Sequence, residues 1–411
     1  MSMKRPYLAL VPLLVAALLW CNGAQAQVLG QSGGLPNVQV PGVGLPALPP
    51  VAPNPRVDAL LRKPLAVTRQ LQIDTLLREE PRRVALDPQG APIVRGEFLA
   101  IGLSAAQIND LQAVGFISTS DAPTDATLGL DIVILRDTRG RTTAAALQTL
   151  EETAPGATFT YQHIYLQAGA GTDGSVATGA SPTITPRRVG LIDGGVDAEN
   201  PALARARIER HGCGKPIASR HGTAVAARLI DGGSDTLYAA DLWCGDKVGG
   251  ATSSLVEALA WMARERVAVI NISLVGPDNP VLARAIQVMI ARGHVLVSAV
   301  GNDGPAAPPL FPAAYPGVIG VSAVDAHDRV LPESGSGQQV AFCASGVVGR
   351  GRSALRGTSF AAPIVARKAA QLLDAPRPGA AAYIEQHLAS EARDLGQPGR
   401  DPRYGYGLLS P

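Results

Sequence analysis

The second half of the chain alternates between short apolar runs and longer segments with helical spacing of apolar residues. The runs are rich in Val, Ile, Leu and Ala, which is typical of strands buried on both faces of a parallel sheet. They span residues 189–192, 238–243, 267–273, 295–300 and 318–321. Helical segments at 253–266 and 281–292 stand between them. This alternation predicts an α/β domain with a doubly wound, mostly parallel sheet over residues 187–411.

Residues 58–167 follow a different pattern. Strands are predicted at 97–101, 116–118, 130–135 and from 158 onward. Ser104 and Thr142 stand where helix N-caps are expected, each ahead of apolar residues at helical spacing. The resulting β-α-β-β-α-β order is that of a small α+β, ferredoxin-like domain. Only weak helix signals precede it, between residues 58 and 77.

Two segments have the composition of linkers. Residues 27–57 are rich in Pro and Gly and show no helical or alternating period, which indicates an extended spacer. Residues 168–186 are rich in Gly, Ser, Thr and Ala. We expect this second linker to be flexible and exposed, and therefore a favoured place for proteolytic cleavage.

The first 26 residues have the pattern of a signal peptide. Lys4 and Arg5 precede the apolar run 7–20, and Ala24-Gln25-Ala26 follows it as a cleavage signature. The run is shorter than the roughly 20 residues that span a bilayer. A membrane anchor is the less favoured alternative. We therefore expect cleavage after Ala26, no stable membrane anchor, and an exported protein that is periplasmic or secreted.

Composition narrows the core and the partners. The chain is 46% hydrophobic but only 4% aromatic, so Ala, Val, Leu and Ile must build the core. Its formal net charge of +2 gives no reason to expect binding to nucleic acid or to anionic lipid.

Export places the cysteines in an oxidising compartment. After removal of the signal peptide three remain, so at most one disulfide can form. Cys213 and Cys244 each lie beside glycine in loop-like sequence, whereas Cys343 lies in an apolar run. We expect a disulfide between Cys213 and Cys244, with three free thiols as the alternative.

Four polar residues stand at predicted strand or helix ends in the second half. Asp193 follows the run 189–192, His221 begins a helix of small residues, Asn302 follows the run 295–300, and Ser359 precedes an apolar helical segment. Taken singly, each is ordinary turn or cap chemistry. Ligands of such sheets bind at the carboxyl ends of the strands, so we expect these residues to lie close together. Together they would supply the groups that acyl transfer needs.

The motifs around these residues resemble those of the subtilisin-like serine proteases. They are Asp193-Gly194-Gly195, His221-Gly222-Thr223, Gly301-Asn302 and Gly357-Thr358-Ser359-Phe360-Ala361-Ala362-Pro363, in the subtilisin order of Asp, His and Ser. The resemblance implies a subtilisin-like fold for residues 187–411. It also implies that Ser359 is the nucleophile, His221 the base, Asp193 the group that orients it, and Asn302 the oxyanion donor.

The same resemblance implies a substrate-binding set. One strand would pair with the extended substrate, a second segment would form the opposite wall of the pocket, and Leu310 would lie at its floor or simply in the core. The strand is Ser273, Leu274, Val275 and Gly276, and the opposite wall is Ala299, Val300 and Gly301. Because these residues carry no charge, we expect an apolar or medium-sized side chain before the cleaved bond.

The resemblance further implies a precursor. Residues 58–167 would be a propeptide that assists folding and inhibits the protease, with self-cleavage within 165–187. The expected partners are polypeptide substrates and this propeptide, in a monomer without cofactor or metal. One departure is notable, because the family usually has Thr or Ser after the aspartate, where this chain has Gly194. A non-catalytic binding or inhibitor module and an esterase are the alternatives.

Overall fold

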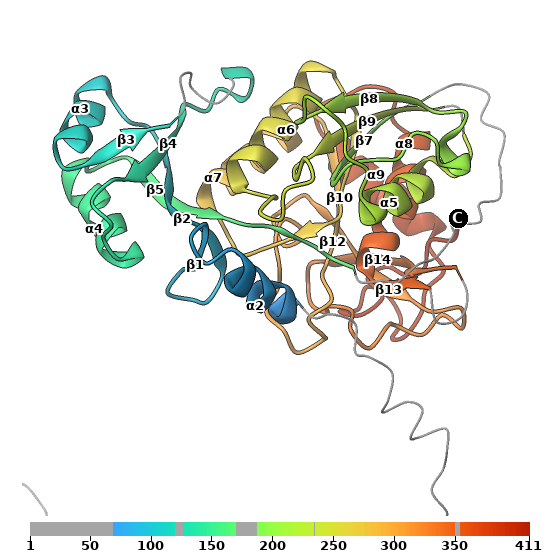
Figure 1. Ribbon diagram of the computed structural model, residues 1–411. Helices are drawn as coiled ribbons and strands as arrows, with labels where there is room; N and C mark the ends of the chain where they lie inside the picture. Colours follow the sequence, from blue (N-terminus) through green and yellow to red (C-terminus); the bar gives the residue numbers. More distant parts are fainter. Residues whose placement is uncertain (1–68, 120–125, 170–186, 234, 350–353) are drawn as a thin grey trace, which may run out of the picture. The chain divides into compact units, whose positions relative to one another are not determined.

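A sheet of seven parallel strands organises the second half of the chain (Figure 1). The computed structural model describes residues 69–119, 126–169, 187–233, 235–349 and 354–411. The predicted signal peptide 1–26, the predicted linker 27–57 and most of the predicted linker 168–186 lie outside the described residues.

The strand order of this sheet reverses beside β7. In spatial order the strands are β14 (Val340–Ser345), β13 (Ile319–Val324), β12 (Val295–Ala299), β10 (Val269–Ile272), β7 (Arg188–Asp193), β9 (Thr236–Asp241) and β8 (Arg207–His211). The chain builds β8 and β9 on one side of β7 and the other four strands on the opposite side. Such a reversal opens a crevice at the carboxyl end of the central strand, and Asp193 is the last residue of β7.

Helices cover both faces of the sheet (Figure 1). One face carries α5 (Arg220–Ile230), α8 (Ala362–Gln371) and α9 (Ala380–Glu391), and the other α6 (Thr252–Arg264) and α7 (Pro280–Ala291). Strand residues alternate between the two: Val295 and Val297 pack in the first core and Leu296 in the second. The predicted doubly wound, mostly parallel α/β sheet is confirmed.

The first half contains a five-stranded antiparallel sheet. The helices and strands of this half are, in chain order, α2 (Arg69–Glu79), β1 (Val84–Leu86), β2 (Pro92–Ile101), α3 (Ala105–Ala113), β3 (Phe116–Ser118), η1 (Ala126–Leu128), β4 (Ile132–Asp137), α4 (Thr143–Thr153) and β5 (Thr158–His163). From β2 to β5 the major elements follow the predicted β-α-β-β-α-β order. Ser104 caps α3 in a capping box and Thr142 caps α4, as their positions indicated.

Helix α2 was only weakly signalled by the sequence. Ile73 is its one buried residue, and it packs with Val84, Ile164 and Leu166 from later in the chain. A helix this short gains most of its stability from tertiary packing, which local sequence does not reveal.

The two faces of the small sheet are both covered. On one, Phe98 and Leu135 pack with residues of α3 and α4. On the other, Leu99 and Ile132 join the apolar cluster that contains residues of α6 and α7. All described residues belong to one compact unit, Lys63–Pro411.

After β5 the chain runs directly into the second half. Strand β6 (Leu166–Gln167) pairs antiparallel with β11 (Leu274–Val275), which follows β10. Ala168, placed by the sequence at the start of an exposed linker, is only 3% exposed. The remaining short elements are η2 (Pro201–Leu203), β15 (Val347–Val348), β16 (Leu355–Arg356) and η4 (Thr358–Phe360). Within the described ranges, no helix combines the length and apolar character needed to cross a membrane.

Candidate active site

Asp193 and His221 form the first contact of the site. The Asp193 side chain is fully buried, and its Oδ1 accepts hydrogen bonds from the backbone N–H of Gly194 at 2.7 Å and from Nδ1 of His221 at 2.9 Å. The first bond fixes the carboxylate. The second leaves Nε2 of His221 as the atom available for proton transfer.

Glycines allow the helix that carries His221 to approach Asp193. Ser219 caps α5, accepting from the N–H of Gly222 at 2.9 Å, so His221 lies in the first turn. A Cβ on Gly222 would lie 2.2 Å from the carbonyl oxygen of Gly194, and one on Gly195 would lie 2.0 Å from that of Ile217. The glycines of the two motifs therefore set the distance between the strand end and the helix.

The second ring nitrogen of His221 faces the chain's own residue Gly169. A Cβ on Gly169 would lie 3.1 Å from Nε2 of His221 and 3.0 Å from the ring of Phe360. Within the described part of the chain, this Nε2 is buried without a hydrogen-bond partner. The ring is held by Asp193 on one side and by Phe360, whose ring centroid is 5.4 Å away, on another.

Ser359 lies in the short turn η4 rather than in the helix itself, which begins at Ala362. The side chain is fully buried. Its Oγ donates to the carbonyl oxygen of Ser273 at 3.2 Å, and the Oγ of Ser273 donates to the carbonyl oxygen of Ser359 at 3.1 Å. The predicted nucleophile and base therefore share one site without a hydrogen bond between them, a common state of such pairs away from the transition state.

The carbonyl oxygen of Ala168 accepts two hydrogen bonds from the predicted oxyanion donors. The backbone N–H of Ser359 donates at 3.2 Å, and the side-chain amide of Asn302 donates through Nδ2. Gly357, at φ 137°, makes room for this carbonyl, because a Cβ there would lie 3.0 Å from the Ala168 oxygen. A side chain would also be strained at this φ.

Thr358 fixes the orientation of the Asn302 amide. Its backbone N–H donates to Oδ1 of Asn302 at 3.0 Å, so the amide must direct Nδ2 toward Ala168. Its Oγ1 accepts from the N–H of Gly301 at 3.1 Å, which ties the two loops together. The sequence pointed to Asn302 but not to this role of Thr358.

The segment that ends at Ala168 lies in an extended, substrate-like conformation. Leu166 and Gln167 pair with Val275 and Leu274, and the N–H of Ala168 donates to the carbonyl oxygen of Ser273 at 3.1 Å. Ser273, Leu274 and Val275 thus hold an extended backbone, although it belongs to the chain itself.

The side chain of Ala168 is buried among apolar residues. It belongs to one cluster with Val275, Ala299 and Leu310, and a Cβ on Gly301 would lie 2.7 Å from Leu310. Val300 is the exception among the predicted wall residues. Its side chain packs with Ala313 and Val340 in a separate cluster, because successive residues of an extended segment point to opposite sides.

Tyr165 lies before Ala168 in the same segment, and its side chain is also buried. Its ring is fully buried, its hydroxyl donates to the carbonyl oxygen of Pro277 at 2.8 Å, and its N–H donates to that of Gly250 at 2.8 Å. A Cβ on Gly276 would lie 2.6 Å from the ring. Sequence reasoning named Gly276 but missed Tyr165 and Gly250, whose only signal was the position of Tyr165 just before the predicted linker.

A disulfide joins Cys213 and Cys244, in the loops that follow β8 and β9. Asp241 lies near both sulfurs, but sulfurs bonded to each other are not the thiolates that bind metal ions. Cys343 is a buried free thiol, and burial raises its pKa to about 12, which keeps it protonated.

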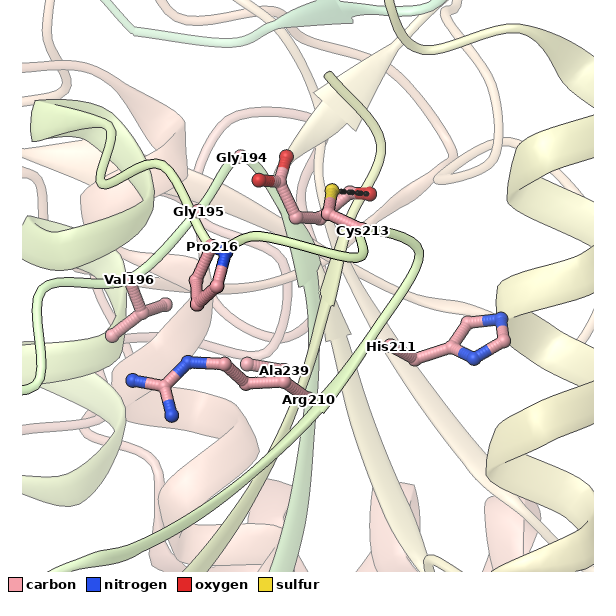
Figure 2. Close-up of a pocket in the computed structure, with 9 residues that line it drawn as sticks. Gly194, Gly195, Val196, Arg210, His211, Cys213, Pro216 and Ala239 are labelled. Atoms are coloured by element: carbon pink, nitrogen blue, oxygen red, sulfur yellow. Dashed lines mark hydrogen bonds between the residues drawn. The ribbon is translucent and has the colours of Figure 1, made fainter. Parts of the chain in front are cut away.

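Gly194 and Gly195 line a small cavity together with residues of β8, of β9 and of the loop that follows β8 (Figure 2). Its volume of about 20 Å³ suits a single water molecule. His211 points away from it, and its ring stacks on Trp261 with centroids 4.9 Å apart. This cavity is too small to be the substrate site.

The sequence is similar to members of one protein family. A model of the subtilase family matches residues 187–407. The minor extracellular protease Epr of Bacillus subtilis is 31% identical over 167 residues, which are 39% of this chain and 26% of that protein. Subtilisin DY of Bacillus licheniformis is 30% identical over 246 residues, which are 54% of this chain and 88% of that protein.

A solved structure extends the likeness beyond the matched region. Fervidolysin from Fervidobacterium pennivorans, described as a keratinolytic enzyme related to subtilisin, has a TM-score of 0.62. The alignment covers 80% of this chain and 61% of that chain at 18% identity. At this identity the likeness is one of fold.

Proposed function

The chain belongs to the subtilase family of serine endopeptidases, and we propose that it cleaves peptide bonds with Ser359 and is made as a precursor that cuts itself between Ala168 and Gly169. The roles of Asp193, His221 and Asn302 that the sequence suggested are part of this proposal.

The position of the Ala168 carbonyl carries the proposal. Its oxygen accepts hydrogen bonds from the backbone N–H of Ser359 and from Nδ2 of Asn302. The same two donors would stabilise the negative charge that forms on this oxygen during attack. On the other side of the same peptide bond, Gly169 lies against Nε2 of His221. The carbonyl is thus held by the oxyanion donors, while Gly169, the residue that would carry the leaving amine, lies beside the base.

The reaction follows from these positions. Ser359 Oγ releases its contact with Ser273, adds to the carbonyl carbon of Ala168 and passes its proton to Nε2 of His221. Asp193 stabilises the imidazolium through Nδ1. When the tetrahedral intermediate collapses, the bond to Gly169 breaks and His221 returns the proton to the leaving amine. Water, deprotonated by His221, then hydrolyses the acyl ester and releases the Ala168 carboxylate and Ser359.

We propose that the region before the cut remains bound as an inhibitor. Contacts that do not depend on the cleaved bond hold it: the β6–β11 pairing, the buried ring of Tyr165, and the ion pair of Arg83 with Asp246 at 2.6 Å. Product release would then limit activation, so residues 58–168 would act as the propeptide.

The proposal also covers other polypeptides, export and assembly. A substrate would pair with β11 as β6 does and place a small or medium-sized uncharged side chain where Ala168 lies. The sequence of residues 1–26 supports export, to the periplasm or beyond the cell. We propose a monomer, because the propeptide region occupies the site from within the same chain.

N-terminal sequencing of two purified proteins tests this function. The wild-type protein should yield a fragment that begins at Gly169. The Ser359→Ala protein, produced in a host without other exported proteases, should keep residues 27–411 joined and begin at Gln27. Processing of Ser359→Ala at the same bond would rule out self-cleavage. An N-terminus at Met1 in the exported fraction would rule out the signal peptide.

A fluorophosphonate probe separates the protease from the two alternatives. Processed wild-type protein, freed of residues 27–168, should form an adduct at Ser359, and the same protein without the probe should hydrolyse a protein substrate. A non-catalytic binding or inhibitor module would form no adduct. An esterase would form the adduct and cleave an ester, but leave the corresponding amide intact.

A further inference from the structure

Gln167 precedes Ala168, the residue whose carbonyl would be attacked, and its side chain contacts the buried carboxylate of Asp193. Its side-chain Nε2 donates to Oδ1 of Asp193 at 3.0 Å. We propose that the site selects substrates with glutamine directly before the residue whose carbonyl is attacked, and that Gly194 determines this specificity. The inference rests on the proposed function and adds a substrate class to it.

The Asp193 oxygen that Gln167 contacts favours a side chain that can donate a hydrogen bond. Oδ1 of Asp193 already accepts from His221 and Gly194, and Gln167 is its third donor. A hydrogen bond to a buried carboxylate is stronger than one between neutral groups. A methionine in place of Gln167 would have similar length but no N–H, and a glutamate would bring a second negative charge beside Asp193.

Gly194 provides the space for the glutamine amide. A Cβ on Gly194 would lie 3.1 Å from Nε2 of Gln167 and 2.6 Å from Oγ of Ser219. Ser219 is held in place, because its Oγ caps α5 through the N–H of Gly222 at 2.9 Å. A side chain at position 194 would therefore clash with Ser219 and would also crowd the amide of Gln167.

Backbone conformation does not require glycine at position 194. Gly194 is not among the residues with positive φ, whereas Gly301 and Gly357 are. A residue with a Cβ could adopt this backbone. Glycine at position 194 therefore matters because it leaves space beside the chain. Gln167 and Ser219 occupy that space.

The backbone of the bound segment determines which side chain meets Asp193. Gln167 pairs with Leu274 in the antiparallel ladder, and Ala168 follows with its carbonyl between Asn302 and Ser359. These contacts use backbone atoms of the segment. Any extended peptide bound in this register would present the corresponding side chain to Asp193.

Peptide cleavage by the processed wild-type enzyme, after the bound residues 27–168 have been removed, tests the preference. Three peptides with the sequence of residues 163–172 would carry Gln, Met or Glu at the position of Gln167. We expect kcat/KM for the Gln peptide to exceed that for the Met peptide by about tenfold, from one hydrogen bond to a charged group. The Glu peptide should be slower than the Met peptide. Equal rates for Gln and Met would overturn the inference, whereas no cleavage of any peptide would refute the proposed function.

Substitution of Gly194 tests its assigned role. Gly194→Ala and Gly194→Ser should both reduce the Gln-to-Met ratio to about one, with each enzyme serving as its own reference. A ratio that stays near ten in either variant would remove Gly194 from the explanation.

A change in the chain's own segment keeps the inference testable if these variants do not fold. Gln167→Met should slow self-processing about tenfold, the rate ratio expected for one charge-assisted hydrogen bond, with the new N-terminus still at Gly169. Its melting temperature, measured in the Ser359→Ala background, should be lower than that of the Ser359→Ala protein with Gln167 intact, because the folded precursor loses the hydrogen bond to Asp193. Processing at an unchanged rate would contradict the inference.

Discussion

The backbone N–H of Ser359 donates a hydrogen bond to the carbonyl oxygen of Ala168 at 3.2 Å. The predicted nucleophile therefore holds a peptide bond of its own chain. Asn302 donates to the same oxygen from the opposite loop. Two donors that converge on one carbonyl have the arrangement required to stabilise an oxyanion.

Removal of the Asn302 amide should slow self-cleavage strongly. We expect Asn302→Ala to lower the rate by about 10²–10³, the loss seen for an oxyanion asparagine in a subtilisin. The rate would be followed as the appearance of the Gly169 N-terminus. Asn200→Ala is the matched control, because Asn200 only caps the short turn η2. A loss below about tenfold for Asn302→Ala would argue against the oxyanion role.

Gly222→Ala should disturb the pair formed by Asp193 and His221. The new Cβ would lie 2.2 Å from the carbonyl oxygen of Gly194, so the first turn of α5 must move. We expect a loss of about 1–3 kcal/mol in unfolding free energy from overpacking, together with slower self-cleavage. Urea unfolding and N-terminal sequencing would measure the two effects.

Gly214→Ala provides the comparison for that prediction. No atom lies within 4 Å of the position its Cβ would take, and its φ is not positive. It should unfold and process like the wild-type protein. Similar losses in both variants would show that close packing at Gly222 is not the cause.

Acid should loosen the hold of the cleaved propeptide region. The hydrogen bond from Arg83 lowers the pKa of Asp246 from 3.8 to about 2. A lowered pKa in the bound state means that this pair stabilises binding fully above about pH 4 and loses its effect as pH falls toward 2. Gel filtration of the processed protein between pH 5 and pH 2.5 should show increasing dissociation.

Asp246→Asn should weaken the hold at neutral pH and reduce its dependence on acid. Asp325→Asn is the control, because Asp325 also has a lowered pKa but pairs with Arg329 four residues away in the same loop. Its pH profile should match that of the wild-type protein. An Asp246→Asn profile as steep as wild type would exclude Asp246 as a source of the pH dependence.

The disulfide should contribute substantially to stability. Cys213 and Cys244 are 31 residues apart, and the chain-entropy relation for a loop of that length gives about 3–4 kcal/mol. We expect the double variant Cys213→Ser, Cys244→Ser, in the Ser359→Ala background, to lose that amount in urea unfolding. Reduction of the Ser359→Ala protein should reproduce the loss. Coincident unfolding curves before and after reduction would contradict the prediction.

Local sequence was enough to predict most elements but not their partners. The apolar run 189–192 predicted a buried strand, and Ser104 predicted a helix start, because both signals depend on near neighbours in the chain. Helix α2 was nearly missed because Ile73 gains its burial from Val84, Ile164 and Leu166. Val300 was assigned to the pocket wall because its sequence position does not show on which side of the segment it packs.

The sequence by itself determined the chemistry available to this protein. The order of Asp193, His221, Asn302 and Ser359, and the glycines beside them, identified the family and predicted the catalytic groups, because motif residues are local. Only the tertiary structure showed which segment of the chain these groups contact. The end of β6 had looked like the start of a linker, yet pairing with β11 brings the Ala168 carbonyl to Ser359 and the amide of Gln167 to Asp193. Contacts between residues so far apart in the chain exist only once the two halves have folded together.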